Sequence, residues 1–166
     1  MTVSDDRDDQ YAKYSDGRIK HLDMVQVVVA RLGGNGFVIK GWAVTIAGAF
    51  QGFGITRENG WLALAGALPT CLFWFLDASF LRSERAFRML YGRIRRGAVE
   101  PFFMNATSPE FLESLEAKER TSLAWRTAIL RPSLGLFYSA LIVSAVAIAV
   151  FIGVWGSDVS QPVQAP

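Results

Sequence analysis

Three long apolar runs dominate the chain, and the third is the clearest. Residues 134–155 contain no charged side chain across 22 positions. An α-helix rises about 1.5 Å per residue, so about 20 apolar residues cross the roughly 30 Å hydrocarbon core of a bilayer. A soluble helix of this length would keep a polar face. The run therefore predicts a transmembrane helix over residues 132–155, with Pro132 at its start, where a missing N–H is harmless.

Two further apolar runs lie upstream and predict a transmembrane hairpin over residues 37–81. The first covers about residues 37–55 and the second about residues 61–81, with a polar turn between them. Such a short turn requires the two helices to be antiparallel. Pro69 predicts a kink in the second helix, because proline removes one hydrogen bond of the helix. The expected fold is thus an all-α membrane protein with three transmembrane helices.

The other segments are more polar. In residues 18–36, apolar and polar side chains alternate with the period of a helix, and the polar ones form a narrow stripe. This pattern predicts a cytoplasmic or interfacial helix with His21 on its surface. Glycines at positions 33, 34 and 36 predict a break at its end. We expect a disordered acidic tail over residues 1–17, a cytoplasmic helical hairpin over residues 82–131 and an external tail over residues 156–166.

Residues 82–131 combine a basic stretch with an acidic one. Apolar side chains up to residue 94 fall on one arc of a helix that continues the second span, and arginines occupy the other side. Ser108 and Pro109 open a second helix rich in glutamate. A charge-complementary antiparallel pair explains this pattern more simply than nucleic-acid binding does. Contact with lipid headgroups or a partner can coexist with it, and the candidate residues are Arg82, Arg85 and Arg88.

The positive charges predict the orientation. The turn between the first two spans contains one Lys or Arg, and the segment after residue 155 contains none. The segment before the first span contains five, and residues 82–131 contain ten. Positively charged loops stay in the cytoplasm. We therefore expect the amino terminus inside and the carboxyl terminus outside, in the inner membrane of a bacterium.

Lys40 and Asp77 are the charged residues within the predicted spans. Because the spans are antiparallel, both fall at a similar depth, close to the cytoplasmic interface. A lone charge at the bilayer centre costs about 2.5 kcal/mol or more, so the two residues are expected to form an ion pair. A structural latch is favoured over a proton or ion relay, because one shallow pair provides no pathway across the membrane.

Small residues on the first span predict close helix packing. Gly48 and Gly52 have the GxxxG spacing, which allows two helix backbones to approach closely in lipid. The spacing fits packing within the monomer as well as a homo-oligomer. Gln51 lies between these glycines at mid-membrane depth, where its amide needs a hydrogen-bonding partner.

Motifs for catalysis or metal binding are absent from the sequence. His21 is the single histidine and Cys71 the single cysteine, so neither a disulfide framework nor a metal cluster is expected within one chain. No GxSxG, HExxH or phosphate-loop pattern is present. We therefore expect a protein that is not an enzyme and has no cofactor.

Three segments together resemble a family of small bacterial multi-pass membrane proteins of unsettled activity. These are KGWAVT at residues 40–45, FWFLD at residues 73–77 and LRxERxFRxLY at residues 81–91. The resemblance implies that Lys40 and Asp77 act as a unit. It also admits a role in phage defence, because some small bacterial membrane proteins of this shape are membrane-acting partners in defence cassettes.

The expected function is that of an oligomeric membrane protein whose cytoplasmic hairpin engages a protein or a small-molecule signal. A first alternative is a pore-forming effector that disrupts the membrane. A second is a transporter or channel subunit, which the single charged pair and the lack of an inverted repeat disfavour. The bilayer is the expected partner of the spans, and we expect no nucleic-acid partner.

Reporter fusions at Gly97 and at Pro166 test the predicted orientation. Three spans place Gly97 in the cytoplasm and Pro166 outside, because the positive charges hold residues 82–131 on the inner side. Two reporters are used, one active only in the cytoplasm and one active only outside. The first should be active at Gly97 and the second at Pro166. The same location for both positions would mean an even number of spans.

Overall fold

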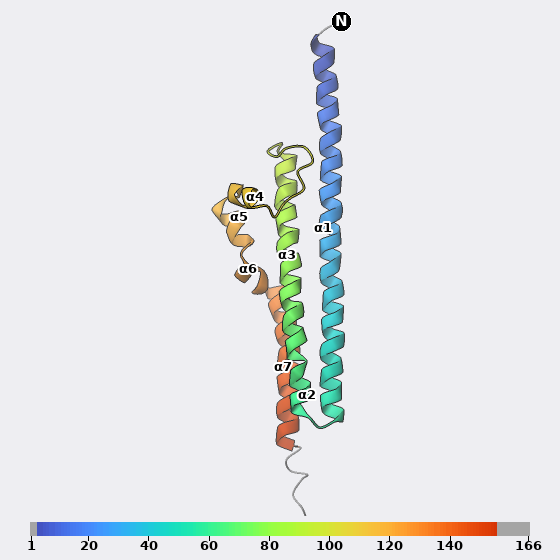
Figure 1. The fold of residues 1–166 in the computed structure, drawn as a ribbon, viewed down its shortest axis with the longest axis vertical. Coiled ribbons are helices and arrows are strands. Elements are labelled where there is room, and N and C mark those ends of the chain that lie inside the picture. The colour runs from blue at the N-terminus through green and yellow to red at the C-terminus, as the bar shows by residue number, and fades with distance from the viewer. Residues whose placement is uncertain (1–2, 156–166) are drawn as a thin grey trace, which may run out of the picture. The chain divides into compact units, whose positions relative to one another are not determined.

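The structure is a computed structural model that describes residues 3–155, with the surroundings of side chains from Asp16 to Val154. Every regular element in this range is a helix (Figure 1). The long helices are α1 (Val3–Thr56), α3 (Ala67–Arg95) and α7 (Pro132–Trp155). The short helices are α2 (Gly60–Ala65), α4 (Pro109–Ser114), α5 (Ala117–Ser122) and α6 (Trp125–Ile129). The expected all-α class is therefore confirmed for the described residues.

Three helical segments are long and apolar enough to cross a membrane: Asp16–Thr56, Gly60–Arg95 and Pro132–Val154. In the most apolar stretch of each segment, at most 22% of the residues are buried within the chain. Large apolar side chains such as Phe37, Trp61 and Leu136 are exposed instead. Exposing so much apolar surface to water would be unfavourable, whereas lipid accommodates it.

The chain divides into two compact units, which we describe separately. The polar unit comprises residues up to Asn35 together with Phe80–Thr127. The apolar unit comprises Gly36–Ser79 and the chain from Ala128 onward. Helices α1 and α3 each contribute residues to both units.

Helix α1 differs from the sequence prediction in two respects. It begins at Val3, within the segment expected to be a disordered tail, and it continues through the three glycines expected to break it. No proline interrupts this stretch. Adding residues to an existing helix is far easier than starting one, and each glycine costs only about 1 kcal/mol relative to alanine. The predicted external tail, residues 156–166, lies outside the described residues.

The second apolar segment is divided near the predicted kink. Helix α2 ends at Ala65 and α3 begins at Ala67, two residues before Pro69. Pro69 has no N–H to donate to the carbonyl of Ala65, and its ring crowds that carbonyl, so a continuous helix is disfavoured here. The Thr70 hydroxyl donates to the carbonyl of Gly66, a buried residue, at 2.7 Å. The break therefore follows from Pro69, and the hydroxyl of Thr70 supplies a hydrogen bond at this point.

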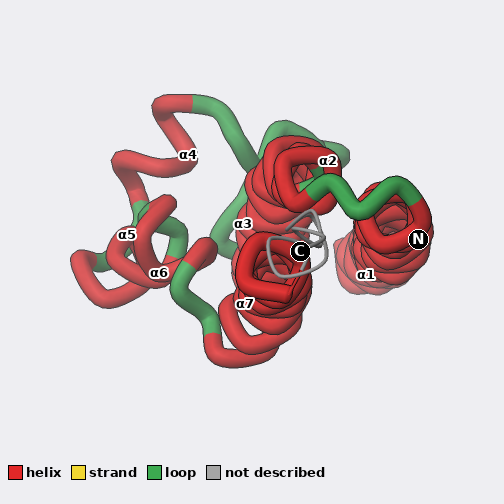
Figure 2. The backbone as a smooth tube through the Cα atoms, turned by 90° about the horizontal axis from the view of Figure 1, so that it is seen from below, coloured by secondary structure: helices red, strands yellow, loops and turns green. Residues whose placement is uncertain are grey.

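Glycines set the close approaches within the apolar unit, but they are not the glycines of the GxxxG motif. A Cβ atom on Gly54 would lie 2.7 Å from the Cβ of Ala63, and one on Gly60 would lie 2.9 Å from the carbonyl oxygen of Ala149. The latter contact places α2 beside α7 (Figure 2). Nothing lies within 4 Å of the corresponding positions on Gly48 and Gly52. Packing through Gly48 and Gly52 thus stays a prediction about contacts outside the single chain.

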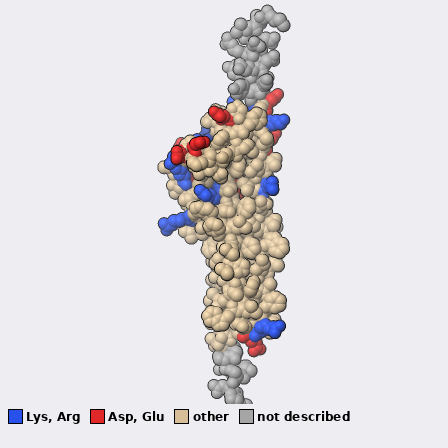
Figure 3. All heavy atoms as spheres, in the orientation of Figure 1, with Lys and Arg blue, Asp and Glu red and all other residues tan. Residues whose placement is uncertain are grey.

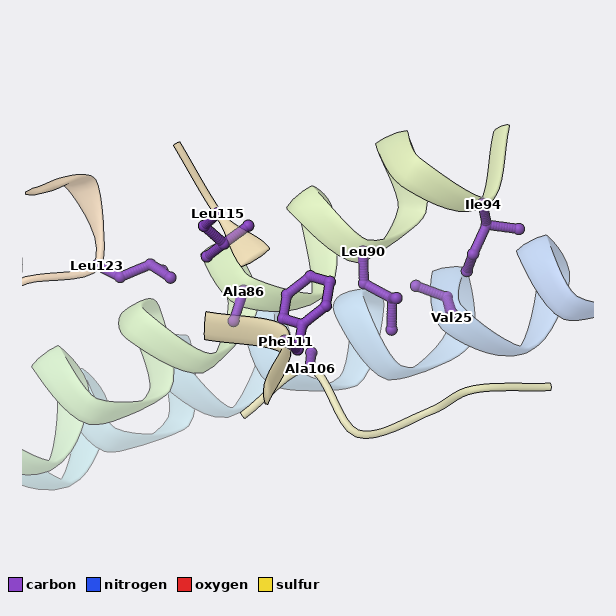
Figure 4. Close-up of a cluster of buried hydrophobic side chains, with 8 residues drawn as sticks. All are labelled: Val25, Ala86, Leu90, Ile94, Ala106, Phe111, Leu115 and Leu123. Carbon is purple, nitrogen blue, oxygen red and sulfur yellow. The ribbon is translucent and has the colours of Figure 1, made fainter. Parts of the chain in front are cut away.

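The core of the polar unit forms where α3 meets α1 and the segment that follows α3 (Figure 4). Leu90 and Ile94 of α3 are buried, as their helical arc predicts, and α3 ends at Arg95. The full set of buried core residues is Val25, Ala86, Leu90, Ile94, Ala106, Phe111, Leu115 and Leu123. This core lets the polar unit bury apolar surface of its own.

The acidic helix expected after Ser108 is instead a series of short helices, so the prediction of one continuous helix was wrong. Leu115 and Glu116 are extended, with ψ angles of 147° and 155°. The carboxylate of Glu119 accepts a hydrogen bond from the N–H of Glu116 at 3.1 Å, which favours a new helix start. The break also allows Leu115 to be buried in the core.

Replacing Gly54 by alanine should destabilise the protein by about 1–3 kcal/mol, because the new methyl would overlap Ala63. The matched control is Gly52→Ala, which adds the same methyl to the same helix in open space. The free energy of unfolding, measured by denaturant titration of the purified protein in lipid-detergent micelles, checks both changes. Equal effects of the two substitutions would contradict the packing described here.

Candidate functional site

The apolar unit contains a buried carboxylate, that of Asp77. Lys40 of α1 forms an ion pair with Asp77 of α3, with 2.5 Å between Nζ and Oδ2. The hydroxyl of Tyr138, on α7, donates a hydrogen bond to the same carboxylate oxygen at 3.2 Å. Asp77 is only 3% exposed. The structure thus brings together the two residues singled out in the sequence and adds a third.

Gly36 makes room for this carboxylate. It lies one helical turn before Lys40, and a Cβ at this position would be 3.1 Å from Oδ1 of Asp77. The Lys40 ammonium also donates to the carbonyl of Gly36 at 3.4 Å. The sequence pattern identified Gly36 only as a helix breaker. In the structure, its missing side chain lets the Asp77 carboxylate approach α1 closely.

Trp74 fixes the position of Tyr138. The two rings stack with their centroids 5.9 Å apart, and the Trp74 indole N–H donates to the carbonyl of Ile129 at 3.1 Å. Neither residue was a candidate in the sequence analysis. The available signal was a tyrosine within an apolar span, since a buried phenolic hydroxyl needs a hydrogen-bonding partner.

The arrangement suits a latch. One carboxylate accepts from an ammonium and a phenol, and these groups come from three different helices. The Lys40 side chain is 30% exposed, whereas that of Asp77 is 4% exposed. No buried side-chain N or O atom among the described residues lacks a hydrogen bond. The polar groups of this site therefore satisfy one another.

A second polar contact ties α1 to α7. The side-chain amide of Gln51 donates to Ser144 Oγ at 3.1 Å and to the Leu141 carbonyl at 3.3 Å. Ser144 also donates to the Leu141 carbonyl of its own helix at 2.8 Å. Gln51 thus has the partner that its position within the span requires.

Arg82 and Arg85 act within the polar unit at the end of a short helix. Arg82 Nε donates to the carbonyl of Leu123 at 2.9 Å, and Arg85 Nη1 donates to that of Ser122 at 2.7 Å. These carbonyls belong to the carboxyl-terminal end of α5, where cations are favoured by the helix dipole and by unpaired carbonyls. The guanidinium of Arg82 also lies 5.0 Å from the ring centroid of Trp125. Both arginines thus have a structural role beside any contact with headgroups.

Arg88 differs, because it pairs with Glu84 on its own helix at 2.7 Å and its side chain is 65% exposed. Arg93, which the sequence analysis did not select, caps α4 by donating to the carbonyl and hydroxyl of Ser114, both at 2.7 Å. Arg93 also lies 3.5 Å from Glu119. The expected attraction between basic and acidic segments is thus largely replaced by arginine-to-carbonyl hydrogen bonds.

His21 is buried, so the prediction of a surface position was wrong. It is 2% exposed, and its Nε2 lies 2.8 Å from the carbonyl oxygen of Phe103. Its Nδ1 accepts from the N–H of Phe102 at 3.3 Å, and the Phe102 ring stacks on the imidazole. Phe102 has a positive φ of 63°. The loop before α4 covers this face of α1, which a helical pattern read in isolation does not reveal.

The chain matches no protein-family model, no curated protein and no solved structure. Among the residues that the structure describes, no group of three or more His, Cys, Asp or Glu side chains is placed to hold a metal ion. The resemblance to small bacterial membrane proteins stays an interpretation of the three sequence segments. The geometry of the site therefore carries the functional argument.

Substitutions of Lys40 and Asp77 should be asymmetric and non-additive. Lys40→Ala should cost about 3 kcal/mol, because it leaves the buried Asp77 carboxylate without its cation. Asp77→Ala should cost less, because the more exposed lysine can extend toward the headgroups and the Tyr138 hydroxyl, a neutral donor, loses a hydrogen bond rather than an ion pair. The double substitution should cost less than the sum of the two. Free energies of unfolding in micelles give the cycle, and strict additivity would show that the pair contributes no coupling.

Proposed function

We propose that this protein is an oligomeric integral protein of the bacterial inner membrane whose cytoplasmic segment, residues 82–131, engages a partner or ligand. The observation that carries the proposal is the internal pairing of the polar groups within the spans. Lys40, Asp77 and Tyr138 bind one another, as do Gln51 and Ser144. Such spans suit an anchor or scaffold better than a conduit, since transport sites usually remain open to a substrate or ion.

The distribution of charge supports the same proposal. On the face shown in Figure 3, charged side chains gather over the polar unit and at the turn between α1 and α2. The rest of the surface of the apolar unit is almost free of charge on this face. The turn has few basic residues, whereas the polar unit has many, as the positive-inside rule requires of a cytoplasmic segment.

An exposed face of α1 supports oligomerisation. Gly41, Thr45, Gly48 and Gly52 are all exposed and recur every three or four residues. The Thr45 hydroxyl donates to the Gly41 carbonyl of its own helix at 3.0 Å, so its hydrogen bond is made within α1. Faces of small residues allow close helix approach in lipid. We propose that a second copy of α1 packs here.

A pore-forming effector is the second candidate, because the same face could assemble several copies around a pore. The resemblance to membrane-acting partners in phage defence also favours it. A stable water-filled pore needs a continuous polar stripe, however, and none of the described spans has one. A transporter or channel subunit has less support, since the single charged centre is closed by its own partners.

Gly48→Leu combined with Gly52→Leu should reduce crosslinked oligomers at least several-fold, because the larger side chains prevent close approach. Gly135→Leu is the matched control, since Gly135 on α7 also has no atom within 4 Å of its Cβ position. Crosslinking in native membranes measures the effect. Oligomers that persist in the double variant would exclude this face as the interface.

A voltage-sensitive dye in the same cells separates the two candidates. The scaffold proposal predicts an unchanged membrane potential even when the protein is greatly overproduced. The pore proposal predicts depolarisation that the double leucine variant abolishes and the Gly135→Leu control retains.

A further inference from the structure

A hollow of about 350 Å³ lies in the polar unit where α3, α4 and α5 meet. Its volume is at the lower end of the range for small-molecule sites. Two arginines from different helices line it, Arg82 of α3 and Arg120 of α5, together with Glu113 of α4. Its remaining walls are apolar and include Pro109, Leu112 and Ala124. The hollow thus combines a polar end with carbon-lined walls.

Both guanidinium groups are held in place by backbone carbonyls. Arg82 Nε donates to Leu123, as described above, and Arg120 Nε donates to the carbonyl of Leu115 at 2.9 Å. Arg120 Nη2 also donates to the carbonyl of Glu113. A guanidinium carries five N–H donors. The described bonds use one donor of Arg82 and two of Arg120, which leaves each group with Nη hydrogens beyond those bonds.

The charges of the lining residues indicate the class of ligand. Two arginines and one glutamate give the hollow a net charge of +1. A planar guanidinium matches the oxygens of a phosphate, and prior anchoring reduces the entropy lost on binding. The Glu113 carboxylate would repel a second negative charge. A phosphodiester, which carries a single negative charge, therefore fits better than a phosphate monoester.

We propose that this hollow binds a phosphodiester that bears a hydrocarbon group. The phosphate lies between Arg82 and Arg120, and the hydrocarbon lies against Pro109 and Leu112. The inference rests on the proposed function, because it names the ligand class of the segment proposed to engage one. The phosphodiester has two sources, a phospholipid headgroup or a soluble compound, and the chemistry of recognition is the same for both.

Dibutyl phosphate is the test ligand, because it is a monoanionic phosphodiester with two short hydrocarbon chains. Calorimetric titration of the full-length protein in maltoside micelles should give saturable binding to one site. Butyl phosphate at pH 8, where it is largely a dianion, should bind several-fold more weakly. An absence of saturable binding by dibutyl phosphate, or a preference for butyl phosphate, would overturn the assignment.

Two substitutions of exposed residues test the location without removing either arginine. Glu113→Gln should tighten dibutyl phosphate binding about fivefold, because it removes the repelling carboxylate. Its matched control is Glu110→Gln, since Glu110 is an exposed glutamate of the same helix that does not line the hollow. Ala124→Leu should weaken binding at least tenfold by filling the hollow, whereas Ala117→Leu, outside the hollow, should not. Equal effects within either pair would overturn the proposed location.

Reconstitution into nanodiscs of phosphatidylglycerol identifies the source of the ligand. If the headgroup occupies the hollow, the dibutyl phosphate binding seen in micelles is lost in the nanodiscs. If the natural ligand is soluble, this binding persists with the same affinity. If the reporter fusion places Gly97 in the cytoplasm but dibutyl phosphate does not bind in micelles, this inference alone is overturned. If the reporter fusion places Gly97 outside and dibutyl phosphate still binds, the proposed function is overturned instead.

Discussion

The buried carboxylate of Asp77 is the constraint on which the apolar unit depends. An ionised group in a medium of low dielectric is costly unless it is paired, and this one is paired from two sides by Lys40 and Tyr138. The three residues belong to α3, α1 and α7, so one acceptor fixes the depth and the rotation of three helices. Lipid gives apolar side chains little preference for one another, which makes such polar contacts and the close approaches at Gly54 and Gly60 decisive for specificity.

A different rule holds the polar unit together. Helices α4, α5 and α6 have only five or six residues each, and helices this short are not stable by themselves. Arg93 and the pair Arg82 and Arg85 bind the carbonyls at the ends of α4 and α5. Helix α3 therefore acts as a template whose arginines complete the hydrogen bonding of the segment that folds onto it.

This use of arginine changes how the basic face of α3 is interpreted functionally. A row of arginines in a sequence indicates an electrostatic surface for lipid or nucleic acid. Once three of them are bound to the protein's own carbonyls, broad attraction to a polyanion becomes a weaker explanation. Local recognition becomes a stronger one, because an anchored guanidinium presents its remaining donors in a fixed direction. The proposed phosphodiester site follows from Arg82 being a structural residue and a lining residue at once.

The sequence by itself determined the properties that depend on local composition and on length along the chain. Hydropathy located the three apolar segments, because each residue meets lipid directly, and the antiparallel order placed Lys40 and Asp77 at matching depths. The tertiary structure decided what depends on rotation about a helix axis and on the path of a loop. Tyr138 reaches Asp77, and Gly54 rather than Gly48 meets a neighbouring helix, because of how the helices are rotated. His21 is buried because a loop from beyond α3 folds over it, bringing together residues some 80 positions apart. No pattern within a single helix encodes such a contact, since its partner is chosen only when the chain packs.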